Sequence, residues 1–339
     1  MNTIKLALAG YGNVGQAFTR MLAKRVEYIE EKYGLTPVIT AVCTARRGSL
    51  VIPEGIDTQK LDAGEYDSLF DKSLSTFDVI DNADYDILVE LTPLNIETGQ
   101  PATDHFRHAM SRGKHVITAN KGPIAWHYRE MRDLAKACGV QLCYEATLMD
   151  GIPVYNLVED TLQGCVITEV KGIFNATTNF LLRELENGVD FEEAVRKGQD
   201  EGFVEADPSL DIDGWDAAGK LTALMNVVMD AHINPMEIDR TGIRDITAED
   251  VAAAKAEGKR YKLICHGYYD ENGNPVGSVA PQLVDSESIY STINATESSV
   301  TFTTDLMGDV TVIEHEHYPD IDHTAYGILS DLLRILNRI

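Results

Sequence analysis

The feature that most constrains the fold is a glycine motif placed directly after the first apolar run. Residues 4–9 are typical of a short β-strand, and residues 10–15, Gly-Tyr-Gly-Asn-Val-Gly, fit the pattern G-x-G-x-x-G. An amphipathic helical pattern follows over residues 14–32. A glycine-rich turn without a ligand is the simpler interpretation. The strand before the motif and the helix after it favour a dinucleotide-binding turn.

Each position of this motif has a physical role in that interpretation. Gly10 permits a tight turn, Gly12 lets the backbone approach a pyrophosphate, and Gly15 allows the helix to pack closely on the strand. The pyrophosphate then meets the exposed N–H groups at the helix N-terminus, where Asn13 and Val14 lie. We therefore predict that this motif binds the phosphates of a dinucleotide.

The first half of the chain alternates apolar runs with amphipathic stretches. Such alternation produces parallel strands, right-handed crossovers and helices on both faces of a sheet. We therefore predict a Rossmann-type, doubly wound α/β domain. Further strands are expected at residues 38–43, 85–91, 115–118 and 140–144, and helices at residues 98–112 and 126–138.

The pattern changes from about Gly151, where helical stretches dominate and strand-like runs flank them. This change predicts a second, α+β domain, which agrees with a length of 339 residues, too long for one hydrophobic core. The final amphipathic stretch, residues 324–336, is expected to return to the first domain as a helix. The other helices of this half are expected at residues 152–162, 177–187, 191–201, 214–229 and 248–257, and strands at residues 166–173, 261–267 and 300–304.

Net charge and hydropathy exclude several classes of function. The 54 acidic side chains outnumber the 29 basic ones and give a net charge of −25. Nucleic acids and anionic membranes repel a chain of this charge. No apolar run approaches the ~20 residues of a membrane span, and the N-terminus lacks a signal-peptide pattern. We therefore expect a cytoplasmic protein with neither nucleic-acid nor membrane partners, whose five scattered cysteines are reduced.

The end of the second predicted strand bears on which dinucleotide binds. A carboxylate at this point would bind the ribose 2′-hydroxyl of NAD. The sequence instead places Arg46 and Arg47 there. A guanidinium suits the 2′-phosphate of NADP, so NADP is favoured over NAD. A pair of solvated arginines is the alternative.

Two segments at strand ends carry polar side chains. Residues 118–123, Thr-Ala-Asn-Lys-Gly-Pro, follow a strand at the sheet edge where ligands bind, and Thr92 follows another strand at this edge. Asn120 and Lys121 therefore become candidate ligand-binding residues, although an exposed lysine at a turn is the simpler interpretation. Residues 175–179, Asn-Ala-Thr-Thr-Asn, lead from a strand into a helix. Helix capping alone can explain them, and the cluster could equally hold a small polar substrate.

A third segment crowds carboxylates at the start of a helix. Five of them lie between Glu205 and Asp216, where the helix dipole favours negative charge. Asp216 and Lys220 lie four residues apart, which makes them neighbours on one helical face. The alternative is a surface ion pair beside an acidic turn. A lysine on a face that continues into apolar residues favours a site for a small polar substrate.

These segments, taken in order along the chain, resemble the homoserine dehydrogenase family. The resemblance implies a short, monofunctional enzyme that interconverts L-homoserine and L-aspartate 4-semialdehyde with NAD(P), in threonine and methionine biosynthesis. It rests on the glycine motif and on Ala-Asn-Lys-Gly-Pro at 119–123, Glu-Ala-Thr at 145–147, Gly-Ile-Pro at 151–153, Asn-Ala-Thr-Thr-Asn at 175–179, Glu-Ala-Asp-Pro at 205–208, and Asp-x-x-Gly-x-Asp-x-x-x-Lys-Leu at 211–221.

The resemblance implies roles for individual residues. Lys220 and Lys121 resemble the two site lysines of the family, and Lys220 is the general acid/base. Asp216 resembles the residue that hydrogen-bonds the reacting hydroxyl. Glu205 resembles the residue that binds the substrate ammonium, and Asp211 a further carboxylate of the substrate site.

The resemblance also implies contacts beyond the reacting groups. Thr177 falls in a segment that approaches cofactor and substrate. The family binds a monovalent cation, Na⁺ or K⁺, and its oxygen ligands correspond here to Glu145, Leu148, Asp150 and Ile152. A homodimer is expected. The implied domains are a dinucleotide-binding domain at residues 1–144 and 319–339, a dimerisation region at 145–153 and 265–318, and a catalytic domain at 154–264.

The sequence departs from the family pattern at two points, and only the second of them, residues 312–323, favours a different function. Ala176 stands where the family has glycine, and residues 312–323 lack a glycine-rich segment that lines the cofactor cleft. The alternative is a dinucleotide-binding sensor that has lost its chemistry, and the retained lysines and carboxylates count against it. Aspartate-semialdehyde dehydrogenase is set aside, because none of the cysteines lies in the turn-to-helix context of a nucleophile.

Overall fold

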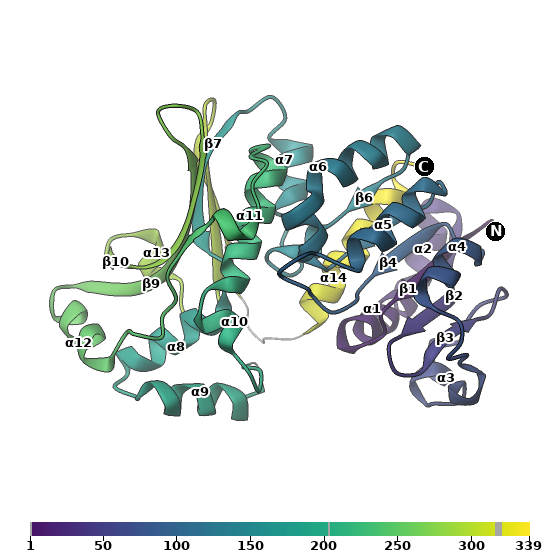
Figure 1. Cartoon of the computed structure of the whole chain (residues 1–339), viewed down its shortest axis with the longest axis horizontal. Helices are drawn as coiled ribbons and strands as arrows, with labels where there is room; N and C mark the ends of the chain where they lie inside the picture. The colour runs from purple at the N-terminus through teal and green to yellow at the C-terminus, as the bar shows by residue number, and fades with distance from the viewer. Residues whose placement is uncertain (1, 203, 316–320) are drawn as a thin grey trace. The chain divides into compact units, whose positions relative to one another are not determined.

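Two sheets organise the part of the chain that the computed structural model describes, residues 2–202, 204–315 and 321–339 (Figure 1). Each sheet belongs to its own compact unit. Unit 1 comprises residues 1–155 and 320–339, and unit 2 comprises residues 156–319. The three-part division expected from the sequence stays a prediction.

The sheet of unit 1 contains β1 (Asn2–Ala9), β2 (Leu35–Thr44), β3 (Gly48–Val51), β4 (Ile87–Glu90), β5 (His115–Thr118) and β6 (Leu142–Cys143). Its strand order is β3-β2-β1-β4-β5-β6, and the pairs are parallel except for the β2–β3 hairpin. The chain order reverses at β1, which has β2 on one side and β4 on the other. Ligands of such sheets bind beyond the carboxyl ends of the strands at this reversal.

Helices cover both faces of this sheet. They are α1 (Asn13–Ala23), α2 (Val26–Tyr33), α3 (Thr58–Asp62), α4 (Thr76–Asn82), α5 (Ala102–Ser111), α6 (Lys121–Cys138) and α14 (Ile321–Leu336), with α7 (Tyr155–Thr161) at the boundary to unit 2. The arrangement confirms the predicted doubly wound α/β fold. Within the described ranges, no helix combines the length and the hydropathy that crossing a bilayer requires.

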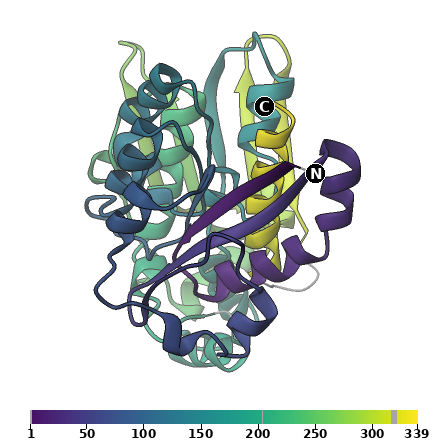
Figure 2. The same ribbon diagram turned by 90° about the vertical axis from the view of Figure 1, so that its right-hand side faces the viewer.

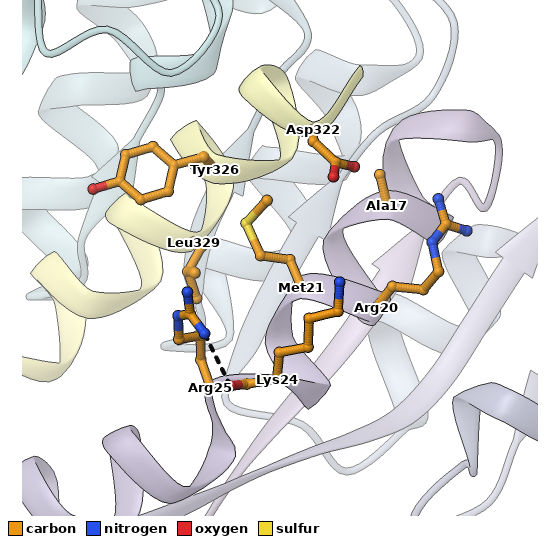
Figure 3. Close-up of a pocket in the computed structure, with 8 residues that line it drawn as sticks. All are labelled: Ala17, Arg20, Met21, Lys24, Arg25, Asp322, Tyr326 and Leu329. Carbon is orange, nitrogen blue, oxygen red and sulfur yellow. Dashed lines mark hydrogen bonds between the residues drawn. The ribbon is translucent and has the colours of Figure 1, made fainter. Parts of the chain in front are cut away.

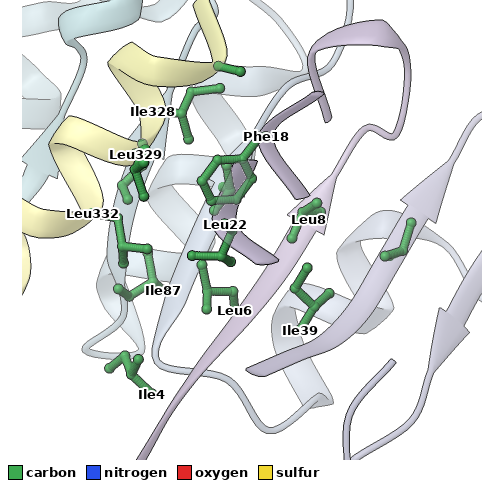
Figure 4. Packing of buried hydrophobic residues seen from close by; sticks show 14 of the residues in the cluster. Ile4, Leu6, Leu8, Phe18, Leu22, Ile39, Ile87, Ile328, Leu329 and Leu332 are labelled. Carbon is green, nitrogen blue, oxygen red and sulfur yellow. The ribbon is translucent and has the colours of Figure 1, made fainter. Parts of the chain in front are cut away.

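The core of unit 1 joins helices from the two ends of the chain. Ile4, Leu6 and Leu8 alternate along β1 and therefore point to the same face of the sheet. There they pack with Phe18 and Leu22 of α1 and with a group of α14 residues (Figure 4). The α14 helix packs against α1 and returns to unit 1 as predicted (Figure 2). The core residues from α14 are Ala325, Ile328, Leu329, Leu332, Ile335 and Leu336.

Two helices of unit 1 differ from the sequence-based prediction. The single helix expected over residues 14–32 is divided into α1 and α2 at Lys24 and Arg25, whose N–H groups bond three residues back and tighten the turn. The helix expected from residue 126 begins at Lys121 instead. Asn120 caps it, and Pro123 is tolerated because the first turn of a helix has no bonded N–H to lose.

The sheet of unit 2 is mainly antiparallel, in the order β12-β11-β7-β9-β10-β8, with only β8 and β10 parallel among the described pairs. Its strands are β7 (Ile167–Ile173), β8 (Asp239–Arg240), β9 (Lys259–Tyr269), β10 (Pro275–Asp285), β11 (Ser298–Thr304) and β12 (Gly308–Glu314). Its helices are α8 (Ala176–Glu186), α9 (Phe191–Asp200), α10 (Ser209–Ile212), α11 (Trp215–Val228), α12 (Ala248–Ala256) and α13 (Ile289–Thr292).

A buried lysine links this sheet to α8. Lys262 on β9 is 2% exposed, and its Nζ donates to Asn179 Oδ1 at 2.7 Å and to the Ile293 carbonyl at 2.5 Å. Burial is the main cause that lowers the pKa of Lys262 from 10.5 to about 8, although the charge of Glu186 opposes the change. The folded chain therefore binds this proton less tightly than the unfolded chain does.

We expect the free energy of unfolding to rise through this group between pH 8 and pH 10.5, where the unfolded chain keeps the proton that the folded chain loses. Below that window both states are protonated, and burying the ammonium costs the folded state up to about 3 kcal/mol. Urea unfolding of wild type and of Lys262→Met checks this at about pH 7.5 and 9.5. The wild type should gain stability relative to the variant at the higher pH, whereas the exposed Lys255→Met control should follow the wild type. An unchanged difference would contradict the assignment.

Candidate active site

An open groove of about 970 Å³ lies beyond the carboxyl ends of β1, β2 and β4 in unit 1. It occupies the edge at which doubly wound sheets bind their ligands. The groove is lined by the glycine loop, the end of β2, the start of α4, and the segment between β4 and α5. These residues are Gly10, Tyr11, Gly12, Cys43, Thr44, Ala45, Arg46, Arg47, Ser75, Thr76, Phe77, Leu91, Thr92, Pro93, Asn95, Gln100, Pro101 and His105.

The glycine loop fits a pyrophosphate. Gly10 has a φ of +106°, and a Cβ there would lie 2.5 Å from the Leu91 carbonyl oxygen. A Cβ on Gly12 would meet no atom within 4 Å, so the space in front of Gly12 is open. Gly12 is also the N-cap residue of α1 and offers no side chain to the first N–H groups of the helix. Those N–H groups and the positive end of the helix dipole suit a phosphate anion.

The rest of the motif supports the loop. Asn13 is exposed at the start of α1, and Val14 packs against the core of unit 1. A Cβ on Gly15 would lie 3.1 Å from the Gly10 carbonyl oxygen. Gly15 therefore permits the close contact between helix and loop that the sequence motif predicts.

The two arginines after β2 have different surroundings. Arg47 pairs with Asp67, with 3.0 Å between Nη1 and Oδ1, and its guanidinium lies 4.4 Å from the centre of the Phe70 ring. Arg46 is exposed and lines both the groove and an adjoining cavity of about 370 Å³. Lys72 and the hydroxyl residues Ser49, Ser75 and Thr76 also line this cavity. Arg46 is therefore the arginine better placed for an anionic ligand.

The ends of β4 and β5 are joined by the side chain of Asn120. Its Nδ2 donates to the Thr92 carbonyl at 3.0 Å, and its Oδ1 accepts from the N–H of Gly122 at 3.0 Å. Thr92 lines the groove, whereas Asn120 is buried and holds the two strand ends together. Lys121 is the first residue of α6, half-buried beside its cap.

Unit 2 gathers Asn175, Asp211, Asp216 and Lys220, which we call the Lys220 cluster. Lys220 Nζ lies 3.2 Å from Asp216 Oδ2 and donates to the Phe174 carbonyl at 2.9 Å. Asn175 Nδ2 donates to Asp211 Oδ1 at 2.6 Å and to Asp216 Oδ2 at 3.0 Å. The side chains of Lys220 and Asp216 are 19% and 15% exposed, so the pair is partly shielded from water.

Local structure places these four groups. Asn175 follows β7 and caps α8, because its Oδ1 accepts from the N–H of Thr178 at 2.8 Å. Asp211 lies on the short α10, and Asp216 and Lys220 lie one turn apart at the start of α11. The cluster therefore offers an amine that can exchange a proton, beside two carboxylates that can bind polar groups.

Two other predicted residues of unit 2 lie nearby in sequence. Thr177 is 9% exposed in the first turn of α8, two residues after the cap. Glu205 is exposed in the segment before α10, and its backbone carbonyl accepts from Gln199 Nε2 at 3.1 Å. The described hydrogen bonds do not join the Glu205 carboxylate to the Lys220 cluster.

Sequence profiles of one family match both units. The profile described as "Homoserine dehydrogenase, NAD binding domain" matches residues 10–145, and the profile described as "Homoserine dehydrogenase" matches residues 153–333. The chain belongs to the homoserine dehydrogenase family. The function predicted from the sequence motifs is thereby confirmed at the level of the family.

Individual homoserine dehydrogenases match nearly the whole chain. The "NAD(+)-dependent homoserine dehydrogenase" of Pseudomonas canavaninivorans is 34% identical over 99% of this chain and 97% of its own. The homoserine dehydrogenase of Methanocaldococcus jannaschii is also 34% identical, over 98% of each chain. A crystal structure of a putative homoserine dehydrogenase from Archaeoglobus fulgidus has a TM-score of 0.87 and 32% identity, covering 98% of this chain and 99% of that one. The sensor alternative is not favoured by these relatives.

The loop with the predicted cation ligands is built around a buried carboxylate. Glu145 is 1% exposed, and its Oε1 accepts from the N–H groups of Val154 at 2.6 Å and Tyr155 at 2.8 Å. Asp150 has a φ of +47°, and its Oδ1 accepts from the Thr324 hydroxyl at 2.7 Å. The loop thus turns sharply around Glu145. Leu148 is buried in this loop, and Ile152 follows it.

The two departures from the homoserine dehydrogenase pattern are only partly visible. Ala176 is the first residue of α8, directly after the cap Asn175. Residues 316–320 of the segment 312–323 lie outside the described residues. Residues 312–314 of that segment belong to β12, and His315 Nδ1 lies 2.7 Å from Glu297 Oε1.

Two buried thiols near the candidate sites, those of Cys43 and Cys265, are unsuited to act as nucleophiles. Cys43 lines the groove, and burial raises its pKa. Cys265 lies on β9, and burial raises its pKa to about 12. Both thiols favour the neutral form, which is a poor nucleophile.

A separate cavity of about 230 Å³ lies between α1 and α14 (Figure 3). Arg20, Lys24 and Arg25 surround it, with Asp322 and Tyr326 on the α14 side. The three cations lie at or after the last turn of α1, where the helix dipole favours positive charge. Arg25 also donates to the Lys24 carbonyl at 3.2 Å. Helix stabilisation accounts for this group.

Sequence reasoning missed several residues that shape the two sites. The sequence pattern marks Asn175 as a helix cap or as part of a polar substrate-binding cluster, but does not predict that its amide bridges two carboxylates. Phe77 and His105 line the groove but belong to no motif that the sequence displays. The polar segment 175–179 carried the signal for Asn175, whereas only the folded chain brings α4 and α5 to the groove.

Proposed function

We propose that this chain oxidises the terminal hydroxyl of L-homoserine to L-aspartate 4-semialdehyde and catalyses the reverse reduction, with Lys220 transferring the proton. The observation that carries the assignment of Lys220 is its place between a carboxylate and a backbone carbonyl in a partly buried cluster. Family membership supports the reaction, and it also supports a role in amino-acid biosynthesis.

In the oxidation, Lys220 acts as the neutral amine and takes the proton of the substrate hydroxyl. In the reduction, the ammonium of Lys220 donates that proton to the forming alkoxide. Asp216 hydrogen-bonds the hydroxyl, and the carbonyl of Phe174 orients the Lys220 amine. Such proton transfer contributes typically 10²–10⁴-fold to a rate, on the order of 3–5 kcal/mol.

The carboxylates of unit 2 suit the amino-acid part of the substrate. Homoserine carries an ammonium, which requires a negative partner when it leaves water. Glu205 is our proposed partner, on the basis of its motif, and Asp211 is a further carboxylate of the substrate site. The cluster of two carboxylates and one lysine has an excess of negative charge, which supports the binding of a cation. Thr177 completes the proposed substrate contacts.

The glycine loop, Thr92 and the start of α6 are proposed to hold the dinucleotide. When bound, the dinucleotide would supply the hydride acceptor for the oxidation and the hydride donor for the reverse reaction. The N–H groups at the start of α1 would bind its pyrophosphate, and Thr92 lines the groove beside them. Asn120 keeps the strand ends together so that Lys121 lies at the ligand-binding edge.

We favour NADP over NAD as the dinucleotide. The cavity beside the groove presents Arg46, Lys72 and four hydroxyl residues, a set that suits the 2′-phosphate of NADP. Arg47 already pairs with Asp67 and contributes less. The relative from P. canavaninivorans is named as NAD(+)-dependent, so the preference requires a direct test in this chain.

Arg46→Ala should lower kcat/KM for NADP by about one to two orders of magnitude and leave kcat/KM for NAD nearly unchanged, because only the 2′-phosphate loses its partner. Arg47→Ala is the matched control, since it removes a neighbouring cation that is engaged elsewhere. Initial rates with both dinucleotides in the three proteins give the ratio. A wild type that prefers NAD, or a ratio that Arg46→Ala does not move, would contradict the proposal.

The reaction itself is tested by one assay on the purified chain. Homoserine with NADP or NAD is followed by the absorbance of the reduced dinucleotide, and aspartate 4-semialdehyde is trapped as product. L-threonine and L-serine serve as controls with a hydroxyl one carbon closer to the ammonium. The proposed function would be overturned if homoserine reduced neither NADP nor NAD.

We further propose a monovalent cation site and a homodimer. The buried Glu145 and the carbonyls of Leu148, Asp150 and Ile152 supply oxygen ligands of the type that Na⁺ and K⁺ prefer. Thermal unfolding in NaCl, KCl or choline chloride tests the site.

The dimer is supported by three exposed apolar side chains, those of Val166, Leu306 and Met307, which are 59%, 70% and 64% exposed. A mass of 37.4 kDa by light scattering would contradict it.

A further inference from the structure

A buried carboxylate behind the wall of the proposed dinucleotide groove pairs with a histidine that lines the groove. Glu90, the last residue of β4, is 0% exposed, and His105 on α5 is 2% exposed. Glu90 Oε1 lies 3.3 Å from His105 Nδ1. Burying a carboxylate is costly unless it is paired and hydrogen-bonded, so this pair must be held by its surroundings.

The same carboxylate holds Thr92. Its Oε1 accepts from the Thr92 N–H at 3.3 Å and from the Thr92 hydroxyl. The hydroxyl of Thr118, at the end of β5, lies 3.5 Å from Glu90 Oε2 and donates to the Glu90 carbonyl at 3.0 Å. Glu90 therefore holds the end of β4, which precedes Thr92, next to the end of β5. The Thr92 carbonyl in turn accepts from Asn120, the cap of α6.

His105 contacts a second aromatic residue that lines the groove. His105 lines the groove, and its ring lies 4.8 Å from the ring of Phe77, measured between centroids. Phe77 lies on α4 and also lines the groove. Contacts therefore connect Phe77, through His105 and Glu90, to Thr92. Phe77 and Thr92 both line the groove, so two parts of its lining depend on one buried pair.

We propose that Glu90 and His105 form a positioning pair that sets the walls of the groove and thereby the affinity for the dinucleotide. The inference rests on the proposed function only in taking the groove as the dinucleotide site. Glu90 acts through Thr92, and it is a positioning residue because it does not line the groove itself. Neither the glycine motif nor the Lys220 cluster includes this pair.

The test is the dissociation constant of reduced dinucleotide, measured by fluorescence titration of the full chain without homoserine. Glu90→Leu should raise the Kd of NADPH and NADH alike by about tenfold or more, because Thr92 loses its anchor. Glu90→Gln keeps an acceptor of the same shape and should stay within about threefold of wild type. The KM for homoserine at saturating dinucleotide should change much less than the Kd in either variant.

A double-mutant cycle separates positioning from general destabilisation. Thr92→Val removes the hydroxyl that Glu90 holds, so adding Glu90→Leu to Thr92→Val should raise the Kd by a smaller factor than Glu90→Leu does in the wild type. Additive effects would overturn the proposed action through Thr92. Where Glu90→Leu fails to fold, Thr92→Val alone decides the question, because a Kd equal to that of the wild type would overturn the proposed action through Thr92.

His108→Gln is the matched control. His108 lies on the same helix, its ring is 5.0 Å from that of Phe77, and its Nδ1 is 2.9 Å from an Asp81 oxygen. It is not a lining residue of the groove, so its replacement should leave the Kd unchanged. An equal loss in His108→Gln, or an unchanged Kd in a folded Glu90→Leu, would overturn the proposal. A chain that binds dinucleotide and shows this pattern without turning over homoserine would contradict the proposed function alone.

Discussion

Lys220→Ala should lower kcat for homoserine oxidation by about two orders of magnitude or more, because the reaction loses the group that takes the hydroxyl proton. The KM for homoserine should change much less, since Asp211, Asp216 and Glu205 remain to bind the substrate. Lys220→Ala also removes the cation that lies 3.2 Å from the Asp216 carboxylate, so Asp216 loses its ion-pair partner in this variant. Steady-state rates in both directions, with saturating dinucleotide, give the two constants.

Two controls make this result specific to proton transfer. Lys220→Arg keeps the positive charge beside Asp216 but cannot release a proton at ordinary pH, so it should be nearly as slow as Lys220→Ala. Small primary amines added to the alanine variant should restore part of the rate, because they can occupy the space of the missing side chain. Turnover in Lys220→Ala close to wild type would remove Lys220 from the mechanism.

The two glycines of the loop should respond in opposite ways to the same small change. Gly10→Ala should destabilise the fold by about 3 kcal/mol or more, because a Cβ there meets a backbone oxygen and the φ of the residue is positive. Gly12→Ala should fold with a stability within about 1 kcal/mol of wild type, because its Cβ meets nothing within 4 Å. The dinucleotide should nevertheless bind the Gly12 variant about tenfold or more weakly, since the new methyl group occupies the space of the pyrophosphate.

Urea unfolding and fluorescence titration with reduced dinucleotide distinguish these outcomes. Each variant serves as the control for the other, because both add one methyl group to the same loop. A Gly12→Ala protein that binds dinucleotide as wild type does would show that no ligand approaches this backbone. A Gly10→Ala protein of normal stability would show that the loop rearranges easily.

Patterns local in sequence predicted most of the fold of unit 1. The strand at residues 115–118 and the glycine loop lie where the alternation of apolar runs placed them. The division between α1 and α2 escaped prediction, because the apolar spacing continues to the buried Ile29 while a tight turn intervenes at Lys24. In unit 2, the sequence pattern did not predict the β10 strand, for a different reason. Both of its faces mix polar and apolar residues, so it shows no clear alternation.

The candidate sites were less predictable because they depend on contacts between distant residues. The pair Asp216 and Lys220 follows from helical spacing alone. The bridge from Asn175 to Asp211 spans 36 residues, and the contact between Glu90 and His105 joins a strand to a helix. Lys262 is buried at a position where a strand pattern gives no reason to expect a charge. Such contacts are properties of the folded chain.

The return of α14 to unit 1 sets the order in which the two units can be completed during synthesis. Residues 325–336 leave the ribosome after every residue of unit 2, and yet they cover Leu6, Phe18 and Leu22, which are made first. Unit 2 therefore has its full sequence available while the apolar face of β1 and α1 is still open to water. A nascent chain halted before α14 should accordingly be the form that chaperones bind most strongly through the N-terminal segment.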